Sequence, residues 1–196
     1  GMESTGVYWR PVYETIEEFS PYYESIVVSN AHNMRNLPGR KTDVKDAEWI
    51  ATLLQHGLLE PSFIPNRIIR DLREFSRTYK NSISERSRCL NRLEKFLQTH
   101  GFKLSSVLSD INCVSGIRIL TVLSEQGSLS VEDVTNAISS NTKKSATEIQ
   151  SAICGRLNPN ECFLLNDFLE QLNLIQNHID KILAKMKDVA SPYTSI

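Results

Sequence analysis

The sequence predicts a mainly α-helical fold with a partial α/β layer at its beginning, two long antiparallel coiled-coil helices and a small helical domain. Three observations support this prediction. The strongest strand signal is a single short β-branched run, ESIVVSN, in residues 24–30. Two long segments carry apolar residues alternately three and four positions apart, which is the spacing of a buried helical stripe. Between them, residues 102–158 hold short apolar stretches separated by Ser, Gly and Asn, as expected for several short helices.

Residues 2–60 are expected to form the α/β part. A helix is predicted for GVYWRPVYETIEEF, where Pro11 is tolerated because it lies near the start. The strand predicted from ESIVVSN follows, and NAHNMRNLPGR after it is a predicted loop. A second helix comes next, so the order is helix, strand, loop and helix, which is typical of an α/β layer.

This second helix begins with two carboxylates. GRKTDVKDAEWIATLLQHGLL places apolar residues at helical spacing, and Gly57 stands where a helix commonly stops. Asp43 and Asp46 are three positions apart, so they share a face of the first turn. Acidic residues are favoured there because they complement the helix dipole, which is one interpretation of the pair. The other is half of a Mg²⁺ site, since Mg²⁺ binds through a few carboxylates together with substrate phosphates.

Each long helix carries a heptad stripe. The first, in residues 61–101, ends at the stop signal His100-Gly101, and two polar residues interrupt its stripe. Its members are Ile69, Leu72, Ser76, Tyr79, Ile83, Arg86, Leu90, Leu93 and Leu97. The second occupies residues 159–190, with the members Leu165, Phe168, Leu172, Ile175, Ile179, Ile182, Met186 and Val189. Because the short helices between them let the chain turn back, the two stripes are expected to pair antiparallel. Polar stripe positions often select a partner, and we also expect a homodimer built mainly through these helices.

The composition excludes several classes of protein. The chain has 196 residues, of which 40% are hydrophobic and 23% charged, with a net charge of −1. This is an ordinary globular composition. No apolar run approaches the length of a membrane span and no signal peptide is present, so a cytoplasmic protein without a membrane partner is expected. The four cysteines form no C-x-x-C pair, which argues against a disulfide or metal framework.

The distribution of charge says more than its sum. Residues 67–95 hold nine basic and four acidic residues, a local charge of +5. A basic helix can track phosphates. It can equally present a solvated face with ion pairs, which is the commoner case.

A third carboxylate lies near the beginning, in GMESTGVYW. Glu3 precedes the first helix, and in α/β sheets catalytic groups gather at the carboxyl ends of strands. A Glu at a strand end, followed by helix, strand and a helix carrying D-x-x-D, is the order of an RNase H-like nuclease core. Acidic residues in that core hold two divalent metals, which stabilise the attacking and leaving oxygens of phosphodiester cleavage. Glu3, Asp43 and Asp46 are therefore the candidate catalytic and metal-binding residues.

MESTGVYW followed by KTDVKDA resembles the DEDD transposases of the insertion-sequence family IS110, and GFKLSSVLSDINCVSGIRILTVL resembles the segment that follows their nuclease core. The resemblance implies a transposase or site-specific recombinase that mobilises an insertion sequence, with a RuvC-like (RNase H-like) domain in residues 2–60 and Mg²⁺ or Mn²⁺ as cofactor. By this resemblance Glu3 matches the second acid of the family, and Asp43 and Asp46 match the third and fourth. The first acid would lie upstream and a C-terminal serine transposase domain downstream, so a fragment that is inactive alone is expected.

The resemblance also implies partners, namely DNA, a structured guide RNA and a second copy held by the coiled coil. Four basic residues surround the acidic helix start and are candidates for nucleic-acid contact: Arg35, Arg40, Lys41 and Lys45. Simple neutralisation of the two aspartates is an equal alternative for them. A function of another class also stays open, a helical dimerisation or interaction module of a decayed transposase gene with no catalysis.

Overall fold

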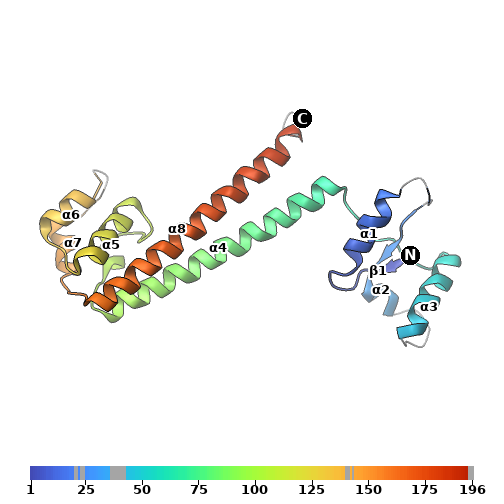
Figure 1. Cartoon of the computed structure of the whole chain (residues 1–196), viewed down its shortest axis with the longest axis horizontal. Helices are drawn as coiled ribbons and strands as arrows, with labels where there is room; N and C mark the ends of the chain where they lie inside the picture. The colour runs from blue at the N-terminus through green and yellow to red at the C-terminus, as the bar shows by residue number, and fades with distance from the viewer. Residues whose placement is uncertain (20–21, 23–24, 36–42, 140–141, 143, 194–196) are drawn as a thin grey trace. The chain divides into compact units, whose positions relative to one another are not determined.

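The computed structural model describes residues 1–19, 22, 25–35, 43–139, 142 and 144–193, which fall into two compact units, Gly1–Asn66 and Arg67–Ile196. The described residues form eight α-helices, two short 3₁₀ helices and one two-stranded sheet (Figure 1). The predominance of helix confirms the prediction from the sequence. None of the helices in this part of the chain combines the length and the hydropathy needed to span a bilayer.

The first unit is built on a parallel pair of very short strands. The strand β1 (Met2–Glu3) pairs with β2 (Val28–Ser29), so that Glu3 lies opposite Ser29. The Met2 amide donates to the Val27 carbonyl at 2.8 Å, and the Ser4 amide donates to the Ser29 carbonyl at 2.8 Å. Parallel strands need a crossover connection, and the helix α1 (Trp9–Glu18) lies between them in the chain. The order of strand, helix and strand is the one expected from the sequence.

The predicted loop after β2 is partly wrong, because it begins as a short helix, α2 (Ala31–Arg35). Asn30 explains the helix start. Its side-chain oxygen accepts a hydrogen bond from the His32 amide at 2.8 Å, which satisfies one of the amides that a first helical turn leaves unpaired. Asn30, which belongs to the predicted loop, therefore caps the amino end of α2.

The helix α3 (Asp43–Gln55) begins at the first of the two aspartates. The helix ends just before Gly57, as the sequence predicts. Gly57 adopts a φ of 66°, its amide donates to the Leu54 carbonyl at 3.0 Å, and the Leu58 amide donates to the Leu53 carbonyl at 2.9 Å. These two bonds satisfy the last carbonyls of the helix in a Schellman motif.

The second unit is organised by two long helices, α4 (Arg67–Thr99) and α8 (Pro159–Ala190), which lie side by side (Figure 1). Three contacts show that they run antiparallel. Arg86 Nη1 donates to Gln176 Oε1 at 2.7 Å, the rings of Phe96 and Phe168 are 5.7 Å apart, and His100 Nε2 lies 3.3 Å from a Glu161 carboxylate oxygen. The predicted antiparallel pairing is therefore confirmed.

The stripe predicted for α8 is confirmed more fully than that for α4. Leu165, Leu172, Ile179 and Ile182 are the buried residues of α8, and all four were predicted. In α4 the buried residues are Arg70, Ser82, Cys89, Leu93 and Leu97, of which only the last two were predicted. Ile69 is 41% exposed, which corrects its assignment to the stripe. Small residues such as Ser82 and Cys89 allow two helices to approach closely, whereas a hydropathy pattern selects the larger neighbours Ile83 and Leu90, which are half-buried.

Short helices connect the two long ones, as the sequence predicted. They are a 3₁₀ turn (Leu104–Ser106), α5 (Val114–Gln126), α6 (Val131–Ala137) and α7 (Ala146–Ala152), and a second 3₁₀ turn (Ser191–Tyr193) follows α8. Ser130, Ser145 and Asn158 cap α6, α7 and α8 in reciprocal capping boxes. The hydroxyl and the amide of Ser130 lower the pKa of Asp133, and the amide and the hydroxyl of Ser145 lower the pKa of Glu148.

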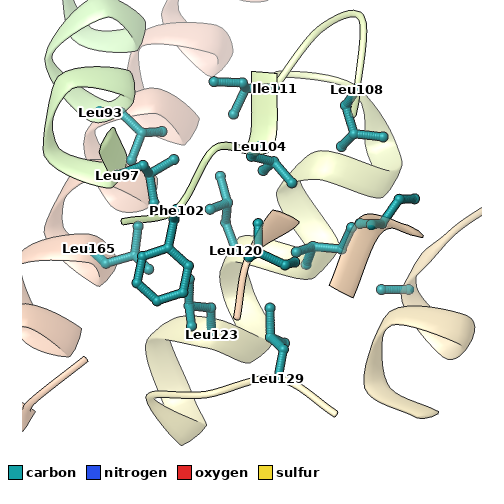
Figure 2. Close-up of a cluster of buried hydrophobic side chains, with 14 of the residues drawn as sticks. Leu93, Leu97, Phe102, Leu104, Leu108, Ile111, Leu120, Leu123, Leu129 and Leu165 are labelled. Atoms are coloured by element: carbon teal, nitrogen blue, oxygen red, sulfur yellow. The ribbon is translucent and has the colours of Figure 1, made fainter. Parts of the chain in front are cut away.

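The main core joins the ends of the long helices to the short ones. Figure 2 shows Leu93 and Leu97 of α4, Leu120 and Leu123 of α5, and Leu165 of α8 in one cluster with Phe102. Gly116 permits the close packing of α5, because a side-chain carbon there would collide with the Ile111 carbonyl.

We predict that Leu165→Ala destabilises the second unit by about 2–5 kcal/mol, because Leu165 is fully buried and its truncation leaves a cavity. Leu164 lies on the same helix and is 48% exposed, so Leu164→Ala is a matched control with an expected effect below about 1 kcal/mol. Urea unfolding followed by far-ultraviolet circular dichroism measures both. Equal effects of the two substitutions would contradict the assignment of the core.

Candidate metal centre

Glu3 is positioned by backbone pairing. It ends β1, and the hydrogen bonds made by the residues on either side of it hold this strand against β2. Its partner in the register, Ser29, is buried, whereas Glu3 itself is half-buried. A carboxylate at the carboxyl end of a parallel strand stands where α/β proteins place ligand-binding groups.

Asp43 and Asp46 are positioned by the start of α3. Asp43 is the first residue of that helix, and Asp46 follows one turn later and is half-buried. The side chain of Asp43 lies outside the described residues. The amino end of a helix carries unsatisfied amides and a positive partial charge, so this turn favours anionic groups.

The packing of α3 on the strands determines the distance between Glu3 and Asp46. Leu53 and Leu59 form a small core with Val27, Trp49 and Ile50. A methyl group built on Gly1 would lie 3.0 Å from Leu59 Cδ1, 3.4 Å from Leu54 Cδ2 and 3.6 Å from Ile50 Cγ2. The amino ends of both strands therefore face the carboxyl-terminal half of α3.

Similar distances along the backbone separate this contact from the two acids. Asp46 precedes Ile50 by one helical turn, about 6 Å along the axis. Glu3 follows Gly1 by two strand residues, about 6–7 Å. Asp46 and Glu3 thus lie at comparable distances along their elements from the contact of Gly1 with Ile50.

The four basic candidates are less well defined. Arg40 and Lys41 lie outside the described residues. Arg35 ends α2 and Lys45 lies in the first turn of α3, but the structure describes only their backbones. Their proposed contacts with phosphates therefore stay predictions.

One polar contact near the site was not predicted from the sequence. Asn33 Nδ2 donates to Glu60 Oε2 at 2.8 Å, and this bond connects α2 with the chain that follows α3. The Ser62 amide then donates to the Val28 carbonyl at 2.7 Å, so this segment runs beside β2. The residues of the first pair are 27 positions apart, and no local spacing signals such a contact.

Comparison with known proteins decides the family. A family model described as a transposase, the DEDD transposases of IS110 elements, matches residues 1–102, which is more than half of the chain. The chain belongs to the IS110 family of DEDD transposases. Neither the search of curated proteins nor that of solved structures found a match. The matched stretch includes β1, β2, α3 and the whole of α4, and with them all three candidate acids.

The donor set of this transposase suits the divalent cation that its family implies. Glu3 and Asp46 offer carboxylate oxygens, which hard cations such as Mg²⁺ and Mn²⁺ prefer over nitrogen or sulfur. Within the described residues, which leave out the side chain of Asp43, no group of three His, Cys, Asp or Glu side chains gathers to hold a metal ion. The described residues thus provide two of the three predicted donors without assembling a complete site.

We predict that Asp46→Asn weakens Mn²⁺ binding at least tenfold, because an amide replaces an anionic ligand. Glu48→Gln is the matched control. It removes one carboxylate from the same helix, on an exposed position that points about 200° away around the axis. Calorimetric titration of both variants measures the effect. Tight binding that survives the replacement of Asp43 and Asp46 together would contradict the assignment.

Proposed function

We propose that this IS110-family chain contributes a RuvC-like acidic site to a transposase that mobilises an insertion sequence by cleaving and joining DNA. The observation that carries this proposal is the strand–helix–strand unit of β1, α1 and β2, which holds Glu3 at a strand end. The helix that begins with Asp43 and carries Asp46 packs beside it. This order of elements supports our proposal that residues 2–60 are an RNase H-like remnant.

Each acid has a separate role in the proposal. Glu3 stands on a strand whose backbone is fixed by hydrogen bonds, so the base of its side chain is held at the end of β1. Asp43 and Asp46 stand on the first turn of a helix, where the dipole also favours an incoming phosphate. A bound Mg²⁺ or Mn²⁺ would supply charge stabilisation at the attacking and leaving oxygens. Arg35, Arg40, Lys41 and Lys45 surround this turn in sequence, and we assign them to the phosphates of the substrate.

The proposed partners are DNA, a structured guide RNA and a second copy of the chain. In the proposal, α4 and α8 act as an antiparallel coiled coil that supports the dimer. Their predicted stripes already face each other within one chain, so the contact between copies must use another surface. Phe163 and Leu174 are 72% and 71% exposed and lie three helical turns apart on one face of α8, away from its buried residues.

We predict that the 196-residue chain alone neither cleaves nor joins DNA, because positions in it match three of the four acids of the family and metal chemistry depends on a complete ligand set. A strand-cleavage and strand-transfer assay with insertion-sequence ends and Mg²⁺ measures this. If the chain turns over DNA, and Asp46→Asn abolishes this activity while Glu48→Gln preserves it, the predicted inactivity is wrong. The assignment of Asp46 to the site would then be supported. Turnover that survives Asp46→Asn would contradict the proposed site itself.

We also predict a homodimer that Leu174→Asp dissociates without loss of helicity, because the charge would replace an exposed apolar contact between copies. Ile175→Asp is the comparison. Ile175 packs against the main core, so this change should disturb the pairing of α4 with α8 as well. Light scattering at several protein concentrations, together with circular dichroism, separates the two effects. A strictly monomeric chain at high concentration would reject the dimer.

A further inference from the structure

The outer face of α4 carries a basic stripe, defined here as Arg73, Arg77, Lys80, Arg88 and Lys95. All five side chains are exposed. Successive members are separated by four, three, eight and seven positions, which are one or two turns of an α-helix. The stripe therefore runs along one side of the helix rather than winding around it.

The stripe lies opposite the face that packs on α8. At 100° per residue, the buried residues Ser82, Cys89 and Leu93 are centred about 155° from it. Ser84 and Asn91 occupy the remaining positions on the basic face, both exposed and uncharged. The acidic residues of the helix lie off this face: Asp71, Glu74, Glu85 and Glu94. Arg70, one turn earlier, is buried and does not belong to the stripe.

Folding does not account for such a stripe. Like charges three and four positions apart on a helix repel one another, so Arg73, Arg77 and Lys80 oppose helix formation. Within the part of the chain that the structure describes, no member of the stripe forms an ion pair. The repulsion is relieved when an anionic surface binds along the helix.

We propose that the basic stripe binds the phosphate backbone of a nucleic-acid duplex. Arg73 and Lys95 are 22 positions apart, about 33 Å at the rise of an α-helix, which is close to one turn of a duplex, about 34 Å. It contains no aromatic side chain, and the binding of single strands generally relies on stacking. Contacts of this kind are independent of base sequence. The stripe is separate from the acidic site, so binding measured in EDTA tests it independently of the proposed metal chemistry.

The test uses the full 196-residue chain and the variant Arg73→Gln/Arg77→Gln/Arg88→Gln. The control variant is Lys103→Gln/Arg118→Gln/Lys181→Gln, which removes the same charge from exposed positions outside the stripe. Binding to a 20-base-pair DNA duplex, to an RNA duplex of the same sequence and to a single strand is measured in EDTA by fluorescence anisotropy over a range of NaCl concentrations. Circular dichroism verifies that both variants stay helical.

Each lost phosphate contact lowers the slope of log affinity against log salt by about 0.9. We therefore expect the stripe variant to bind duplex at least tenfold more weakly, with a slope that is smaller in magnitude by about 3. The slope of the control variant should fall by less than half of this amount. Preference for the RNA or the DNA duplex would identify which of the two supplies the phosphates. Equal losses in both variants, preference for the single strand, or binding of an acidic protein without binding of duplex would overturn the proposal.

Discussion

The second unit depends on the antiparallel contact between α4 and α8. Most of the stability of a helix within a protein comes from the packing of its apolar face rather than from local propensity. The four buried apolar residues of α8 and the buried face of α4 supply it. At the closed end of the pair, His100 and Glu161 lie 3.3 Å apart, and Phe102 leads the chain into the core formed with α5. The short helices therefore pack against the adjoining ends of α4 and α8.

This same contact determines which surfaces remain for partners. Because α4 turns its small and apolar residues toward α8, the basic stripe faces solvent on the opposite side. Because α8 buries Leu165 and Leu172, the exposed Phe163 and Leu174 are directed away from the pair. The apolar face of α8 and the basic face of α4 are therefore distinct surfaces, and we propose the first for a second copy of the chain and the second for nucleic acid.

Much of this fold follows from local patterns in the sequence. Apolar residues at helical spacing indicate the long helices, Gly57 and Gly101 mark the ends of α3 and α4, and Asn158 with Pro159 marks the start of α8. The IS110 resemblance was confirmed by the family match. Features that depend on distant partners were harder to predict. The burial of Ser82 and Cys89 follows from the approach of α8, and Asn33 reaches a carboxylate far along the chain. The order of elements predicts Glu3 and Asp46 as candidate acids, but their separation depends on how α3 packs, which sequence spacing does not encode.

The central claim is that Glu3 and the start of α3 share one cation. Paramagnetic broadening of backbone amide resonances by Mn²⁺ tests it most directly, because the effect depends steeply on distance from the ion. The amides of residues 2–5 and of residues 43–47 should broaden together, with one midpoint in the titration, and both should lose the effect in Asp46→Asn. Broadening of only one of these segments, or two separate midpoints, would contradict a shared site.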